Sequence, residues 1–77
     1  MKIEIYGPGC AKCQNAAAVV EKVTRELGVA VEVVKVTDIN AMLDKGILKT
    51  PAVYVDGRKV MEGRAPSEAD VQGWLAG

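Results

Sequence analysis

Two cysteines, Cys10 and Cys13, are the residues of this sequence best suited to carry out chemistry. A cysteine thiolate is a nucleophile toward disulfides and a ligand for soft metal ions. The chain contains no histidine, which excludes catalytic triads, histidine-ligated zinc and general base catalysis by imidazole. Two cysteines also cannot complete a four-cysteine zinc site within one chain. The two thiols must therefore be explained as a pair.

The cysteine pair stands where a predicted strand gives way to a predicted helix. Residues 2–6 alternate polar and apolar side chains, and Gly7-Pro8-Gly9 then forms a strong turn signal. From Ala11 to Leu27 the apolar residues recur at spacings of three and four, and Gly28 follows as a helix stop. The pair therefore lies at the amino-terminal end of a long helix.

This position favours ionised thiols. A cysteine at a helix N-terminus faces unpaired backbone N–H groups and the positive end of the helix dipole, so we expect a lowered pKa for Cys10. Lys12 adds a nearby positive charge that acts in the same direction. Cys13 lies one turn deeper on the same helical face, at a separation that permits a disulfide.

The remaining patterns complete an α/β fold. Val29 to Val36 is rich in valine and predicts a strand largely covered on both faces. Thr37-Asp38 then offers an N-cap for a short helix that ends at Gly46, with Ile39, Met42 and Leu43 on one face.

The last third of the chain predicts a hairpin and a helix. Residues 52–55 and 58–61 read as two strands joined by Asp56-Gly57, a pair suited to a type I′ turn. Pro66-Ser67 precedes Glu68 in a pattern that resembles a capping box, and Val71, Trp74 and Leu75 supply a buried face. The element order is β-α-β-α-β-β-α, a four-stranded mixed sheet with three helices in a single domain over residues 1–77. The first two strands should be parallel, with strand one near the sheet centre.

Composition excludes several classes of partner. The 77 residues carry ten basic and ten acidic side chains, so the electrostatic footprint of a nucleic-acid or acidic-membrane binder is missing. No apolar run approaches the length that spans a bilayer, and no signal-peptide pattern precedes the first strand. We expect a soluble, cytoplasmic monomer without a nucleic-acid or membrane partner.

Thr50-Pro51 is a second notable feature, directly before the strand at 52–55. Proline donates no hydrogen bond to a sheet, so it belongs at the first residue of a strand or at an edge. Base rates alone favour an ordinary trans bond.

A CxxC sequence by itself is compatible with redox chemistry, with metal binding or with two small buried side chains. With Cys10-Ala-Lys-Cys13 between strand and helix, Thr50-Pro51 before the hairpin and Asp56-Gly57 within it, the whole chain resembles the thioredoxin-fold family. It is most similar to the small redox-active disulfide proteins of archaea and bacteria. The resemblance implies a sheet order of 2-1-3-4 and a cis Thr50-Pro51 bond.

The resemblance also implies a mechanism. The Cys10 thiolate attacks a substrate disulfide, and Cys13 resolves the mixed disulfide. The backbone of Thr50, beside Pro51, pairs with an extended substrate segment. Glu4 stands six residues before Cys10, where thioredoxins carry a buried acid, and so is a candidate proton relay; a solvated strand face is the alternative.

The implied function is a small thiol–disulfide oxidoreductase that acts on protein disulfides through a redox-active Cys10–Cys13 disulfide, with no bound cofactor and no metal. An unidentified reductase or thiol donor supplies its electrons. Gly9 replaces the tryptophan usual before the first cysteine, and Ala11-Lys12 replaces Gly-Pro, so the direction of electron flow stays open.

Two other functions stay open. The first is a soft-metal module in which the two thiolates hold Cu(I), Zn(II) or arsenite. Heavy-metal-associated domains, however, end in a strand, whereas this chain is predicted to end in a helix. The second is a partner-binding adaptor with a silent cysteine pair.

Overall fold

The sheet and the helices follow the predicted order. The computed structural model describes residues 1–9 and 11–76. The elements, in chain order, are β1 Lys2–Tyr6, α1 Ala11–Leu27, β2 Glu32–Val36, α2 Ile39–Asp44, β3 Ala52–Val55, β4 Arg58–Glu62 and α3 Glu68–Ala76. In this part of the chain no helix is both long and apolar enough to cross a membrane.

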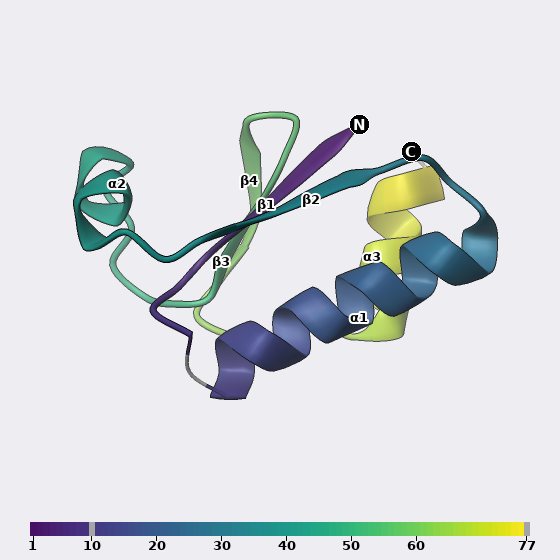
Figure 1. Cartoon of the computed structure of the whole chain (residues 1–77), viewed down its shortest axis with the longest axis horizontal. Helices are drawn as coiled ribbons and strands as arrows, with labels where there is room; N and C mark the ends of the chain where they lie inside the picture. Colours follow the sequence, from purple (N-terminus) through teal and green to yellow (C-terminus); the bar gives the residue numbers. More distant parts are fainter. Residues whose placement is uncertain (10, 77) are drawn as a thin grey trace.

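The four strands form one mixed sheet in the order β2-β1-β3-β4, which confirms the predicted order (Figure 1). β1 lies inside the sheet, parallel to β2 and antiparallel to β3. Tyr6 at the end of β1 is opposite Ala52 at the start of β3. This register brings the end of β1 and the residues that precede β3 to the same end of the sheet.

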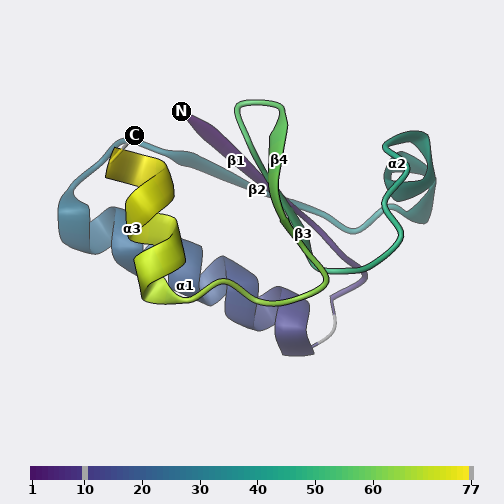
Figure 2. The ribbon, with the colours of Figure 1, turned by 180° about the vertical axis from the view of Figure 1, so that it is seen from behind.

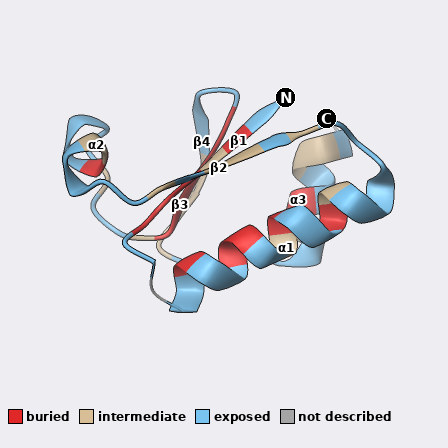
Figure 3. Cartoon of the chain, in the orientation of Figure 1, coloured by how far each residue is buried: buried red, intermediate tan, exposed pale blue. Residues whose placement is uncertain are grey.

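One face of the sheet carries the main core. α1 and α3 both lie on this face, as the two opposite views show (Figures 1 and 2). The helical spacing of α1 turns one stripe of side chains toward the sheet, and that stripe is buried (Figure 3). The buried side chains of this core are Ile3, Ile5, Ala16, Ala17, Val20, Val23, Val53, Val55 and Val71.

The opposite face is covered less completely. α2 lies at one end of the sheet, the end at which β1 finishes and the chain turns toward α1 (Figure 1). It contributes Met42 to a second, smaller cluster with Tyr6, Ala52 and Tyr54. The rings of Tyr6 and Tyr54 meet edge to face, with centroids 5.2 Å apart.

Turn and capping residues act as predicted. The Asp38 side chain accepts a hydrogen bond from the Asn40 N–H at 2.9 Å and caps α2. Asp56 and Gly57 both have positive φ angles, 50° and 85°, as a type I′ hairpin turn requires. Ser67 and Asp70 exchange reciprocal hydrogen bonds of 3.0 and 3.2 Å at the start of α3, which completes a capping box.

Two expectations need correction. The second strand begins at Glu32 rather than Val29, because its ladder with β1 starts at the pair Lys2–Glu32. It is also an edge strand with no buried residue, since α2 lies beyond its end instead of covering it. In α2 itself, Ile39 and Leu43 are exposed, because this six-residue helix turns Met42 and, in part, Ala41 inward.

Burial in the main core determines how much stability is lost when a side chain is truncated. Ile3 is fully buried, so Ile3→Ala should lower the free energy of unfolding by about 2 to 5 kcal/mol in urea titrations. Ile39 is 63% exposed, so the matched substitution Ile39→Ala should change it by no more than about 0.5 kcal/mol. Equal losses from the two substitutions would contradict this assignment of the core.

Candidate active site

Cys13 is buried in the first turn of α1. Its residue is 6% exposed, and no acidic side chain occupies that turn. The long helix therefore directs its positive end toward Cys13, and no carboxylate within the described first turn of α1 offsets it. Cys10, the predicted nucleophile, lies outside the described residues.

Gly7 allows this placement. A Cβ atom built onto Gly7 would collide with the Cys13 Sγ atom and would lie 3.1 Å from the Cys13 Cβ. The same Cβ would lie 3.7 Å from the Cβ of Thr50. The backbone after β1, the start of α1 and the segment before β3 therefore meet at Gly7.

The Thr50–Pro51 peptide bond is cis. Pro51 is fully buried, and its carbonyl accepts a hydrogen bond of 2.9 Å from the Gly63 N–H just beyond β4. Thr50 is half-buried. The structure thus brings two predicted site residues, Cys13 and Thr50, to the same side of Gly7, the side on which a Cβ atom would stand.

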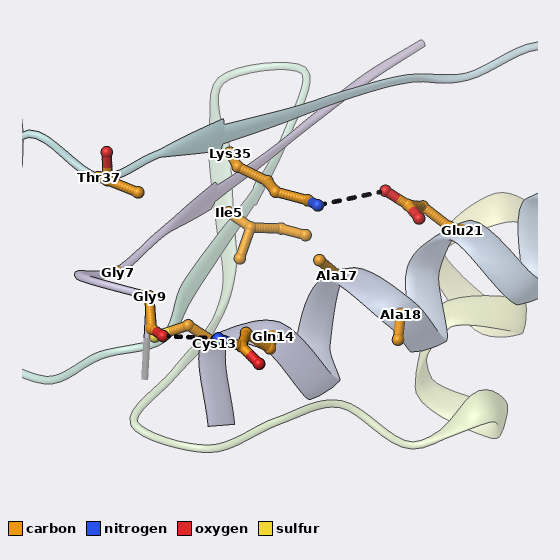
Figure 4. A pocket seen from close by; sticks show the side chains of 10 residues that line it. All are labelled: Ile5, Gly7, Gly9, Cys13, Gln14, Ala17, Ala18, Glu21, Lys35 and Thr37. Carbon is orange, nitrogen blue, oxygen red and sulfur yellow. Dashed lines mark hydrogen bonds and ion pairs between the residues drawn. The ribbon is translucent and has the colours of Figure 1, made fainter. Parts of the chain in front are cut away.

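A pocket of about 160 Å³ opens beside Cys13 (Figure 4). Most of its wall is apolar and made of small side chains. The Gln14 amide donates a hydrogen bond of 3.0 Å to the Gly9 carbonyl at the end near Cys13. At the other end the Lys35 ammonium lies 3.8 Å from the Glu21 carboxylate. The lining residues are Ile5, Gly7, Gly9, Cys13, Gln14, Ala17, Ala18, Glu21, Lys35 and Thr37.

Glu4 is not brought to Cys13. Because side chains alternate along a strand, Ile3 and Ile5 face α1 while Glu4 and Tyr6 face the other side of the sheet. The Tyr6 hydroxyl donates a hydrogen bond of 3.1 Å to Glu4. Burial of the ring, followed by this hydrogen bond, raises the pKa of Tyr6. Glu4 therefore lies on the face of the strand away from α1, where its side chain is only 18% exposed, and its role as a proton relay stays a prediction.

A positive charge, that of Lys45, lies against the tyrosine cluster on this face of the sheet. The Lys45 ammonium lies 4.9 Å from the Tyr54 ring centroid and 5.9 Å from that of Tyr6, within the range of a cation–π contact. Glu4 also lies 4.0 Å from the Lys2 ammonium. These contacts belong to the face of the sheet away from Cys13.

Lys12, a predicted site residue on α1, is exposed to solvent.

Sequence reasoning missed the importance of Gly7, which it treated only as part of a turn. A glycine directly between a strand and a CxxC helix is the available signal, but its meaning depends on Cys13 and Thr50. It also missed Glu62, whose contacts with the chain before Thr50 span 13 and 14 residues in sequence.

The close approach at Gly7 yields a test. Gly7→Ala should force the Cys13 sulfur to move and should cost about 1 to 3 kcal/mol of stability, as overpacking does in other proteins. In a Cys13→Ala background the same substitution should cost less, because the colliding sulfur is gone. Chemical unfolding of the four proteins in this double-mutant cycle measures the difference.

Gly73 provides the matched control for this cycle. It lies within α3, and among the described residues no atom beyond its chain neighbours and the backbone of its own helix lies within 4 Å of a Cβ built onto it. Gly73→Ala should therefore raise stability by about 0.5 to 1 kcal/mol. Additive effects at positions 7 and 13 would contradict the proposed contact.

Comparisons with known proteins agree with this geometry. The sequence model of a thioredoxin domain family matches residues 1–76. A thioredoxin of Methanothermobacter thermautotrophicus is 35% identical over 72 residues, which cover 94% of each chain. A thioredoxin of Methanocaldococcus jannaschii is 40% identical over 70 residues, which cover 91% of this chain and 80% of that one. With this coverage, the chain belongs to the thioredoxin family of thiol–disulfide oxidoreductases.

Proposed function

We propose that the Cys10-Ala-Lys-Cys13 pair cycles between dithiol and disulfide in exchange with protein disulfides. The observation that carries this proposal is the position of Cys13, buried at the start of α1 against Gly7 and on the same side of Gly7 as Thr50. A thiol in that position is shielded from large substrates. It suits the second, intramolecular step of an exchange better than the first.

The reaction proceeds in two displacements. The Cys10 thiolate attacks one sulfur of the substrate disulfide, so that a Cys10–substrate disulfide forms and the other substrate sulfur leaves as a thiolate. Cys13 then loses its proton and attacks the Cys10 sulfur, which forms the Cys10–Cys13 disulfide and releases the second substrate thiolate. Two electrons pass from the pair to the substrate, and a reductase or a thiol donor must return them.

The surroundings of Cys13 support the second displacement. The helix dipole of α1 favours the thiolate of a residue in its first turn. Ile5, an apolar residue, lines the pocket that Cys13 also lines, and Glu4 faces the other side of the sheet. The pocket therefore offers the Cys13 proton a route to solvent, and Glu4 is not needed as a relay.

The substrate lies along the segment before β3 in this proposal. A polypeptide that carries the target disulfide extends past Thr50 and pairs with its backbone, beside Pro51. Lys12 is exposed at the start of α1, where its charge favours an approaching thiolate or an acidic substrate segment. No organic cofactor is required, and action in the cytoplasm stays a prediction.

The two cysteines should respond differently to substitution. Cys10→Ser should reduce insulin reduction to the rate of dithiothreitol alone, because the attacking thiolate is lost. Cys13→Ser should accumulate a mixed disulfide with substrate, visible as a mass adduct and on non-reducing gels, because resolution is lost. Identical behaviour of the two variants would contradict these roles.

An equilibrium redox titration tests the pair itself. In dithiothreitol or glutathione buffers, alkylation and mass measurement should show a reversible two-electron couple between about −300 and −120 mV. Cys10→Ser is the control without a pair. A pair that forms no intramolecular disulfide and instead retains Cu(I) or Zn(II) would overturn the proposal in favour of the soft-metal module. A disulfide that no reductant opens would favour the adaptor.

A further inference from the structure

The 48–50 segment, the three residues before Pro51, is held by a carboxylate from another part of the chain. The backbone N–H groups of Leu48 and Lys49 both donate to one oxygen of Glu62, at 2.9 and 3.1 Å. The Lys59 ammonium donates to the other oxygen at 2.8 Å. Glu62 is the last residue of β4, so the contact ties the loop after α2 to the end of the hairpin.

These hydrogen bonds are charge-assisted. The hydrogen bond from Lys59, followed by those from Leu48 and Lys49, lowers the pKa of Glu62 to about 2. The carboxylate is therefore ionised throughout the neutral range. Hydrogen bonds to an ionised acceptor are stronger than those to a neutral one, so the two N–H groups have a well-defined partner.

The neighbouring residue strengthens the same attachment. The Gly63 N–H donates to the Pro51 carbonyl, which extends the pairing of β3 and β4 by one step. The side chain of Lys49 runs directly over Gly63, where an added Cβ would lie 3.3 Å from its Cδ atom. The tip of β4 thus fixes both the start and the end of the stretch that contains Thr50.

The held segment displays an apolar side chain. Leu48 is 90% exposed, the most exposed of the large apolar residues in the described part of the chain. Its backbone is fixed by Glu62, two residues before Thr50. A leucine that is both anchored and exposed next to the site gains free energy when a partner covers it.

We propose that Glu62 is a positioning residue that fixes the 48–50 segment, and that Leu48 contacts the polypeptide substrate beside its disulfide. The partner is an extended polypeptide with an apolar side chain near its cystine. The inference rests on the proposed function, since a substrate that pairs with Thr50 must pass Leu48. It adds a specificity determinant for polypeptides, which can extend along the 48–50 segment, whereas a small disulfide has no chain that pairs with this segment.

The experiment measures the rate at which the full chain reduces two disulfide substrates, with dithiothreitol as the source of electrons. Insulin is the polypeptide substrate, and a small aromatic disulfide is the reference. Leu48→Ser should lower kcat/KM for insulin by about tenfold, the value of one buried leucine contact, while the rate with the small disulfide stays within about twofold. The loss should fall on KM.

Glu62→Gln tests the positioning role. It removes the charge that holds the two N–H groups, so it should lower kcat/KM for insulin in the same selective way. The double variant with Leu48→Ser should lose no more than the worse single variant, because Glu62 acts through the segment that carries Leu48. A merely structural role would instead slow both substrates alike.

Two control variants separate this effect from the loss of any exposed apolar side chain or of any charge. Leu27→Ser removes a half-exposed leucine at the far end of α1, about 21 Å along the helix from Cys13, and should leave both rates unchanged. Lys59→Met keeps the two backbone hydrogen bonds to Glu62 and should have a smaller effect than Glu62→Gln.

The outcomes decide between the two proposals. Unchanged insulin kinetics in Leu48→Ser, or equal losses with both disulfides, would overturn the inference while the proposed function stands. If Glu62→Gln does not fold, Leu48→Ser still decides, since the side chain it alters lies in solvent. A wild-type protein that reduces neither disulfide would overturn the proposed function and the inference with it.

Discussion

The close approach of Cys13 to the backbone of Gly7 is the constraint on which the site depends. A helix that starts directly after a strand can press its first turn against that strand's end only where no Cβ intervenes. At Gly7 the missing Cβ leaves room for the Cys13 sulfur, and Thr50 lies on the same side. Any larger residue would separate α1 from the segment before β3, and the thiol would lose its buried position.

The sheet register brings these parts to one place. β1 is parallel to β2 and antiparallel to β3, so the end of β1 lies beside the start of β3 through the pair Tyr6–Ala52. A slip of one residue would exchange the two faces of β1, turning Ile5 away from α1 and Glu4 toward it. Burial of Ile3 and Ile5 resists such a slip, because both belong to the main core. The core of this small chain therefore also sets the geometry of its chemistry.

Features encoded by neighbouring residues were predictable from the sequence. The bounds of α1, the capping residues Asp38 and Ser67, and the turn at Asp56-Gly57 each depend on contacts within a few positions. The cysteine pair was recognisable for the same reason. Gly7, Glu62 and the open faces of β2 and α2 were not, because each depends on chain segments that come together only in the folded protein.

The position of Glu4 shows that a residue count does not by itself fix the face on which a side chain lies. Counting six residues back from Cys10 selects Glu4, yet strand alternation assigns the side that faces α1 to Ile3 and Ile5. Glu4 instead accepts a hydrogen bond from Tyr6 within a cluster that includes Lys45 and Tyr54. Thus this chain places the buried Cys13 next to the cis-proline segment and beside a largely apolar pocket, while Glu4 lies on the other face of the sheet.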